Sequence, residues 1–251
     1  MPRRPPDSIP HQRARGRLDL GFARQARGTV LDELFQSSPL RALFPAPEPD
    51  EAITAAVVNT AGGLAGGDTL AVAVRAGDGA VATVSSPAAE KVYRSLGEAT
   101  RIATSLAVGA GARLEWIPQE TILFDGARLE RRIVVDLAAD ARLLMTEVMV
   151  FGRTAHGEVL TSGAIRDSWR IRRDGTLLYA GEGAEALIAP LREGEREWPA
   201  PGGMTLPRPG LLLGRWLGGA LAVRRSVSGA MRMVRAAAMG QPARLPRLWT
   251  T

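Results

Sequence analysis

The chain of 251 residues has a formal net charge of +6, a hydrophobic content of 45%, no cysteine and two histidines, His11 and His156. This length and apolar content indicate one globular domain, or two small ones, with a full core. The absence of cysteine excludes disulfides, thiolate zinc sites and iron–sulfur clusters. Because carboxylates and carbonyls are then the main ligands, we expect any transition metal to be held loosely or shared with a partner.

Neither a membrane nor a nucleic acid is an expected partner. The sequence has no run of about 18 strongly apolar residues, the length that a membrane-spanning helix requires. All but one of its 32 basic residues are arginines, spread along the chain without a dense patch or interleaved aromatic residues. That distribution is typical of a GC-rich coding bias and not of a nucleic-acid-binding surface.

The N-terminal segment is rich in proline and arginine and contains no apolar stretch typical of a secretory signal. We expect residues 1–15 to form a flexible tail. Residues 16–251 are then expected to form a single β-rich domain with a helical part near the C-terminus. The expected location is the cytoplasm.

Residues 16–179 are predicted to form β-structure, because short runs of alternating apolar and polar residues are broken by Gly or Asp roughly every 8–12 residues. Asp78-Gly79 stands between two such runs and predicts a hairpin, and Asp174-Gly175 predicts another turn. Little helix separates the strands, which argues against a doubly wound α/β fold, and no repeat of fixed period is visible. The predicted fold is mainly β, with many short strands in stacked sheets (β-helix-like or sandwich-like) and a few helices, mainly C-terminal.

The composition changes after Glu182. Residues 183–191 predict one short helix, and residues 194–210 predict a loop rich in proline and glycine. Residues 218–240 give the strongest helix prediction, because apolar residues recur at helical spacing and Gly240 followed by a proline ends the pattern. The apolar ending, with Trp249, predicts a C-terminus that packs against the domain.

The stretch NTAGGLAGGDTL, Asn59–Leu70, holds four glycines and Asp68. It is not a phosphate-binding loop, because Asp68 occupies the place of the lysine of a Walker loop and the next segment is a predicted strand. One interpretation is a wide β-turn or bulge, in which glycine supplies positive φ angles. The alternative is a segment whose paired glycines let another backbone approach closely, as at an interface or a channel wall.

Two further stretches are rich in polar groups. Residues 86–95 contain Lys91, the only lysine, which indicates either chance or a need for a compact ammonium group. Residues 114–129 place Gln119 and Glu120 near a strand start. The pattern alone favours ordinary exposed polar residues at a turn.

A fourth stretch, residues 147–158, places Arg153 and His156 beside a turn with carboxylates on both sides. His156 is either a ligand or acid–base group or a hydrogen-bonded turn residue. The sequence shows no nucleophile with a matching base, since it has no cysteine, no paired histidines and no Gly-x-Ser-x-Gly motif.

These four stretches, in this order, resemble the urease accessory protein UreD family, called UreH in some organisms. The ending of the chain is also similar to that family. The matching segments are Asn59–Asp68, Ala89–Ser95, Trp116–Ile122 and Gly152–Glu158.

The resemblance implies a non-catalytic, mostly-β scaffold that binds the urease apoprotein and UreF, which recruits the nickel-carrying GTPase UreG. A homodimer of the accessory complex is also allowed. Such a complex helps to deliver nickel, and CO2-dependent lysine carbamylation, to the urease active site. Nickel is expected to pass transiently through an internal water-filled route, and no cofactor is expected to be bound tightly.

Loosely bound oxygen ligands exchange readily and therefore suit nickel passage. The candidates for that role are Asp68, Glu120, Glu147, Glu158 and His156. Motif residues with an expected structural or contact role are Asn59, Gly62, Gly63, Gly66, Gly67, Lys91, Arg94, Gln119 and Arg153. Replacement of Asp68 by Ala is expected to lower urease activation and leave the fold intact. Residues 194–210 and the C-terminal helix are the expected partner contacts, and a large apolar interface predicts insolubility of the chain expressed alone.

Two other classes of protein are alternatives. An independent carboxylate-metal hydrolase would show turnover by the purified chain alone, although no suitable constellation of residues is visible. A nucleic-acid-binding β-protein would bind arbitrary DNA or RNA in a salt-dependent way.

Overall fold

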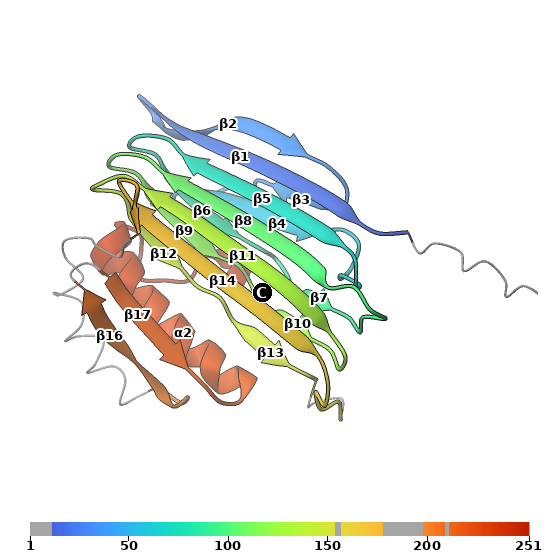
Figure 1. Ribbon diagram of the computed structural model, residues 1–251. Helices are drawn as coiled ribbons and strands as arrows, with labels where there is room; N and C mark the ends of the chain where they lie inside the picture. Colours follow the sequence, from blue (N-terminus) through green and yellow to red (C-terminus); the bar gives the residue numbers. More distant parts are fainter. Residues whose placement is uncertain (1–11, 154–156, 178–197, 209–210, 251) are drawn as a thin grey trace, which may run out of the picture.

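The computed structural model describes residues 12–153, 157–177, 198–208 and 211–250. The fold is mainly β, and the described part of the chain has one long helix near its C-terminus (Figure 1). The predicted fold class is therefore confirmed. None of the described helices combines the length and apolar character that crossing a membrane requires.

The largest sheet has seven strands in the order β15-β14-β11-β8-β5-β1-β2. Its central strands β1, β5, β8, β11 and β14 are parallel, and the edge strands β2 and β15 are antiparallel to their neighbours. The strands are β1 (Arg15–Gln25), β2 (Gly28–Gln36), β5 (Thr69–Ala76), β8 (Thr100–Val108), β11 (Arg128–Leu137), β14 (Ala164–Arg173) and β15 (Thr176–Leu177).

Two smaller sheets lie against the first. The five-stranded sheet, in the order β12-β9-β6-β4-β3, contains β3 (Leu40–Leu43), β4 (Ile53–Asn59), β6 (Val81–Ser85), β9 (Arg113–Ile117) and β12 (Arg142–Met145). The three-stranded sheet, in the order β13-β10-β7, contains β7 (Glu90–Val92), β10 (Thr121–Leu123) and β13 (Met149–Phe151).

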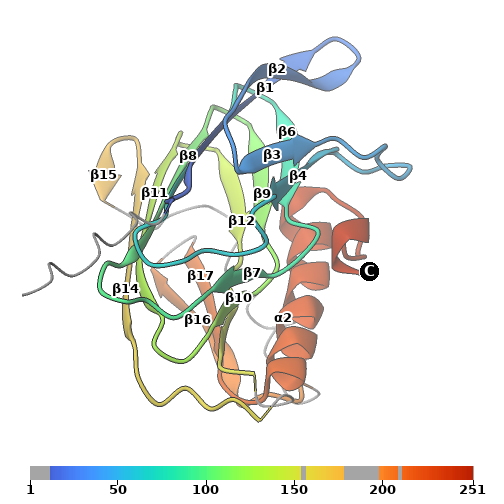
Figure 2. The same ribbon diagram turned by 90° about the vertical axis from the view of Figure 1, so that its right-hand side faces the viewer.

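The chain visits the five-, three- and seven-stranded sheets in turn, so that β6-β7-β8, β9-β10-β11 and β12-β13-β14 form successive rungs of a solenoid-like stack (Figure 2). Equivalent residues of neighbouring rungs pair in parallel register, as Val81 does with Arg113 and Arg113 with Arg142. The rungs differ in length, which explains why the sequence shows no repeat of fixed period.

The predicted hairpin at Asp78-Gly79 is wrong. The turn joins β5 to β6, which belong to different sheets and do not pair. Asp78 Oδ1 instead accepts a hydrogen bond of 2.9 Å from the backbone N–H of Ala110, at the equivalent corner of the next rung. The turn at Asp174-Gly175 is confirmed, because it joins the antiparallel strands β14 and β15 with positive φ at both residues.

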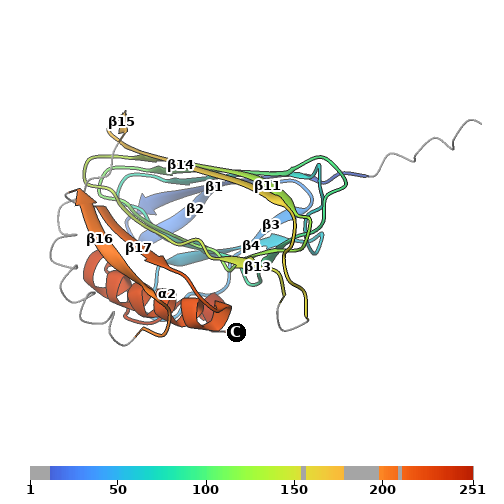
Figure 3. The same cartoon turned by 60° about the horizontal axis from the view of Figure 1, so that its bottom comes forward.

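The main core lies between the seven-stranded and five-stranded sheets. Strand β5 alternates between buried and more exposed residues, because its inner face packs in the core and its outer face meets solvent. Strand β9 is buried on both faces, because the C-terminal helix covers the outer side of its sheet (Figures 2 and 3).

The C-terminal part contains β16 (Gly202–Arg208), β17 (Leu211–Trp216), α2 (Ala220–Val234), a π-helical turn η2 (Arg235–Met239) and a 3-10 turn η3 (Arg247–Trp249). The predicted loop over 194–210 is wrong in part, since β16 pairs with β17. The helix and its end at Gly240, which has φ of 61°, are confirmed. Trp249 is buried, so the C-terminus packs against the domain as predicted. The helix predicted over 183–191 lies outside the described residues.

Candidate functional site

A cavity of about 320 Å³ lies among the sheets, beside the three-stranded sheet, and is partly open to solvent. It brings together residues from all four stretches singled out in the sequence, which lie on different rungs; the fourth stretch contributes Glu147. The candidate residues that line it are Asn59, Gly62, Gly63, Lys91, Gln119 and Glu147. Glu90 and Trp116 of the same stretches and Arg131 of strand β11 also line it. The remaining candidate residues of the described chain lie elsewhere.

The glycine-rich stretch runs from β4 to β5 and lines one side of the cavity. Its Leu64 pairs with Val92, so that the stretch adds one isolated bridge beside the three-stranded sheet. A Cβ on Gly63, which has φ of 144°, would lie 2.4 Å from the Tyr93 ring, and a Cβ on Gly66 would lie 2.2 Å from Ser95 Oγ. These glycines therefore permit the next rung to approach closely. Gly62, Gly63 and Gly67 also have positive φ, as expected for a turn between β4 and β5, so both interpretations of the stretch have support.

Asp68 is buried but is not part of the cavity wall. Its Oδ1 accepts a hydrogen bond of 2.8 Å from the backbone N–H of Ala14, and its Oδ2 accepts one of 2.8 Å from the backbone N–H of Ala65. Both oxygens thus tie backbone segments together at the start of β1 and β5. This geometry gives Asp68 a structural role.

Replacing Asp68 by Ala is therefore expected to lower the free energy of unfolding by about 2–3 kcal/mol, because two amide donors lose a charged acceptor. Asp68→Asn, which keeps one acceptor oxygen, should lose less. Equilibrium denaturation of both variants measures the difference, with Asp136→Ala on the outer face as the control. If the Asp68→Ala variant is as stable as the control, Asp68 has no structural role. The sequence-based expectation that this variant leaves the fold intact would then hold.

Glu90 is the less compensated carboxylate of the cavity. It accepts hydrogen bonds from Asn59 Nδ2 at 3.1 and 3.0 Å and from the backbone N–H of Lys91 at 3.0 Å. Burial raises the pKa of Glu90 above its usual value, although these hydrogen bonds oppose the shift. The structure gives Glu90 no basic side chain as an ion-pair partner among the described residues. Sequence reasoning singled out Lys91 in this stretch and not Glu90.

Glu147 is the second carboxylate of the cavity and belongs to a buried network. Arg131 forms an ion pair with Glu147 and a two-pronged contact with Asp167, at 2.7 and 3.1 Å. Trp116 Nε1 donates a hydrogen bond of 3.0 Å to Glu147 Oε1. Burial raises the pKa of Glu147, and the charge of Arg131 opposes that shift.

Sequence reasoning missed Arg131, although a signal was present. In strand β11 the residues at 129, 131, 133 and 135 are buried, so Arg131 stands at a core position of an alternating strand. An arginine at such a position needs a buried acid as partner. Which acid it meets depends on the stacking of β11 beside β14, which no local pattern shows.

Gln119 and Glu120 are not exposed turn residues, so the interpretation from the pattern alone is wrong. Gln119 is 6% exposed, and its side chain bonds to Arg224 on α2 and to the backbone carbonyl of Leu248. Glu120 forms an ion pair with the same Arg224. The guanidinium of Arg224 also lies 5.0 Å from the ring centroid of Trp249. This motif therefore attaches the C-terminal part to the solenoid-like stack.

Glu158 and Arg153 form an exposed pair away from the cavity, with 2.7 Å between Arg153 Nε and Glu158 Oε2. Arg153 also stacks on Phe124, at 4.3 Å from the ring centroid. The Arg153 hydrogen bond lowers the pKa of Glu158. His156 lies outside the described residues. Arg94 pairs with Asp125 at 3.3 Å and lines a separate surface pocket.

The described residues contain no group of three or more His, Cys, Asp or Glu side chains that could hold a metal ion. What the cavity offers is a set of oxygen donors at intervals along its wall, with Glu90 and Glu147 as the charged ones. Such donors hold divalent transition metals weakly in comparison with imidazole or thiolate.

The comparisons with known proteins agree with the motif pattern. The family model described as UreD urease accessory protein matches residues 14–183. A urease accessory protein UreD from Granulibacter bethesdensis is 50% identical over 238 residues, covering 82% of this chain and 99% of the relative. Another from Magnetococcus marinus is 39% identical over 284 residues, covering 98% of this chain and 97% of the relative. The chain therefore belongs to the UreD family of urease accessory proteins.

Proposed function

We propose that this chain is a non-catalytic cytoplasmic scaffold that binds the urease apoprotein and UreF, and through UreF the nickel carrier UreG. We also propose that nickel passes through the cavity beside the three-stranded sheet. The observation that carries the proposal is the cavity itself. Its wall combines residues of the four stretches 59–70, 86–95, 114–129 and 147–158, which lie far apart in the sequence, and the carboxylates Glu90 and Glu147 face a volume of about 320 Å³.

The charge pattern of the cavity favours passage over storage. Arg131 compensates Glu147, which leaves Glu90 as the carboxylate held by neutral donors alone. A single carboxylate with neighbouring amide and hydroxyl oxygens binds a divalent cation weakly and releases it readily. Nickel is thus the cargo of this site and not a resident cofactor.

The exposed apolar residues of the C-terminal part support a role in binding a protein partner. Leu213 on β17, Leu217 after it and Leu221 at the start of α2 are all exposed. We propose that this part, which includes the described portion of residues 194–210, contacts UreF or urease. The chain expressed alone should then be poorly soluble, and soluble monomeric expression would contradict this assignment.

The proposed scaffold role is tested by a tagged pull-down from cells that co-express this chain with urease subunits, UreF and UreG. Recovery of urease apoprotein together with UreF is the expected result. Recovery of neither, from a soluble and folded bait, would overturn it. Catalytic turnover by the purified chain would instead favour a carboxylate-metal hydrolase.

Glu90→Gln is expected to lower nickel incorporation into urease by roughly half or more, because the cavity loses the carboxylate that has no ion-pair partner among the described residues. The measurement is nickel per urease active site after co-expression. The variant should be at least as stable as the parent at pH 7. A carboxyl group whose pKa is raised on folding destabilises the folded state as pH rises above its ordinary value, and an amide removes that effect.

Glu130→Gln is the matched control, because Glu130 lies on the outer face of the seven-stranded sheet and pairs with Arg101. It should leave nickel incorporation unchanged. Equal incorporation by the Glu90→Gln variant and the parent, with pull-down of partners intact, would remove Glu90 from the nickel path and leave the scaffold role standing.

A further inference from the structure

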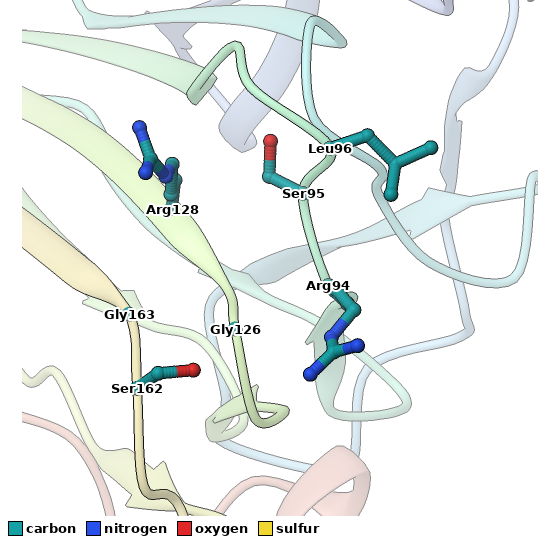
Figure 4. A pocket seen from close by; sticks show the side chains of 7 residues that line it. All are labelled: Arg94, Ser95, Leu96, Gly126, Arg128, Ser162 and Gly163. Atoms are coloured by element: carbon teal, nitrogen blue, oxygen red, sulfur yellow. The ribbon is translucent and has the colours of Figure 1, made fainter.

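A second pocket, of about 260 Å³, lies on the surface where three rungs turn into the seven-stranded sheet (Figure 4). Each rung contributes a short segment just before β8, β11 or β14. The lining residues are Arg94, Ser95, Leu96, Gly126, Arg128, Ser162 and Gly163. None of them lines the cavity beside the three-stranded sheet.

The backbone around this pocket is fixed by contacts between rungs. Ser95 N–H donates to the carbonyl of Gly126, and Gly126 N–H donates to the carbonyl of Ser162. Gly126 has φ of 74°, and a Cβ there would lie 2.9 Å from Arg94 Nε, so the glycine lets the arginine side chain lie close against the backbone. The pocket is thus built by the fold and is not a gap between mobile loops.

Asp125 lies beside the pocket, and both of its carboxylate oxygens already have partners. Its Oδ1 accepts hydrogen bonds from the backbone N–H and the hydroxyl of both Thr161 and Ser162. These bonds, those from the backbone first, hold the pKa of Asp125 well below its usual range. Its other oxygen pairs with Arg94 at 3.3 Å. Asp125 therefore carries a full negative charge that Arg94 balances.

Arg128 leaves one positive charge in excess at the pocket. Its guanidinium donates a hydrogen bond of 3.2 Å to the carbonyl of Gly97, and within the described ranges no carboxylate pairs with it. The side chain of Arg94 is also largely exposed, at 67%. Two guanidinium groups and two hydroxyls thus line a pocket that has a net charge near +1.

We propose that this pocket binds a single carboxylate group carried by an acidic segment of a partner protein. Guanidinium groups recognise carboxylates through paired N–H donors. A monoanion matches the excess charge, whereas a dianionic phosphate would leave one negative charge without compensation. Leu96, which is 84% exposed at the rim, provides an apolar contact for the chain that carries the carboxylate. The inference rests on the proposed function only in that the chain has a protein partner.

The test uses the full chain fused to a solubility tag and a fluorescently labelled oligoglutamate peptide, with binding followed by anisotropy. Low salt, about 50 mM, limits screening of exposed charges. Arg94→Gln combined with Arg128→Gln should weaken binding about tenfold, the effect of losing one good charge-assisted contact. Arg128→Lys, which keeps the charge but loses the paired donors, should give an intermediate loss.

The matched control combines Arg24→Gln with Arg27→Gln, which removes the same charge at the exposed end of the β1–β2 hairpin. It should bind the peptide as the parent does. Acetate should displace the peptide at lower concentration than inorganic phosphate does. Equal loss in the two double variants would show general charge attraction and overturn the proposal. Stronger displacement by phosphate would overturn the assignment to a carboxylate. Because the assay contains no urease or nickel, its failure leaves the proposed scaffold role untouched.

Discussion

Replacing Arg235 by methionine is expected to lower the free energy of unfolding by about 3–5 kcal/mol, because the change leaves a buried charge without its partner. Arg235 begins the π-helical turn after α2 and is 1% exposed. Its Nε lies 2.9 Å from Glu115 Oε1 on β9, and Glu115 is 2% exposed. Thr83 Oγ1 donates a hydrogen bond of 2.7 Å to the other oxygen of Glu115. Equilibrium denaturation with urea measures the loss.

Two further variants separate the buried charge from a general effect of substitution. Arg235→Met combined with Glu115→Leu should recover most of the loss, because neither charge is then left unpaired. Glu51, the other acid near Arg235, still has an ion-pair partner in this double variant, because its Oε1 lies 3.3 Å from Arg244 Nε. Arg172→Met removes an exposed pair of 3.9 Å with Asp136 and should change stability by less than about 1 kcal/mol. Equal losses for Arg235→Met and Arg172→Met would contradict the buried-pair interpretation.

Local sequence patterns predicted the elements of this fold better than their arrangement. The alternation in β5 and β11 indicates strands, and the helical spacing before Gly240 indicates α2, because both patterns depend on residues close in the chain. The Asp78-Gly79 pattern predicts a turn, but it does not determine whether the two flanking strands pair with each other or with strands of later rungs. Only the stacking of corners, such as Asp78 on Ala110, decides between the two.

The candidate site was predicted in part for the same reason. The four stretches do contribute to one cavity, but Asp68 faces two backbone amides and Glu120 faces Arg224. A sequence shows that a carboxylate is present, but it does not show which hydrogen-bond or ion-pair donor lies next to that carboxylate in the fold. Sequence reasoning missed Arg131 and Glu90. Their contacts are with residues of neighbouring rungs, which lie about 30 residues away in the sequence, a spacing typical of solenoid repeats.

One residue of the cavity wall, Gln119, also contacts the C-terminal part. Gln119 lines the cavity, and its side chain also holds Arg224 and the carbonyl of Leu248. Trp249 Nε1 donates a hydrogen bond of 2.7 Å to the carbonyl of Ile117 on β9. A partner that displaces the C-terminal part would therefore change the contacts of a residue in the cavity wall. This connection joins the two roles proposed for the chain, binding of partners and passage of nickel.

Replacing Arg131 by methionine is the second change with a large expected effect. At pH 7 it should lower the free energy of unfolding by about 3–5 kcal/mol, because Glu147 and Asp167 then face each other without their shared cation. Arg132→Met is a matched control from the same strand. Its side chain points outward and is exposed, so that variant should lie within about 0.5 kcal/mol of the parent.

The loss of unfolding free energy caused by Arg131→Met should also depend on pH. The direction of that dependence follows from the raised pKa of Glu147. Burial already raises the pKa of Glu147, and removal of Arg131 removes the charge that opposes the shift. The folded variant then binds a proton more readily than the unfolded chain, so its stability falls as pH rises from the ordinary glutamate value through the raised one. The difference between variant and parent should therefore shrink when the pH is lowered from 7 towards 5.

Adding Glu147→Gln to Arg131→Met tests this explanation. The double variant should be more stable than Arg131→Met at pH 7 and should lose the extra pH dependence, because the group that takes up the proton is gone. If Arg131→Met is as stable as Arg132→Met, or if its loss grows on acidification, the pairing of Arg131 with Glu147 does not hold the cavity wall together. If the double variant is stable and still supports nickel incorporation, Glu147 acts in the fold, and Glu90 remains the carboxylate of the nickel path.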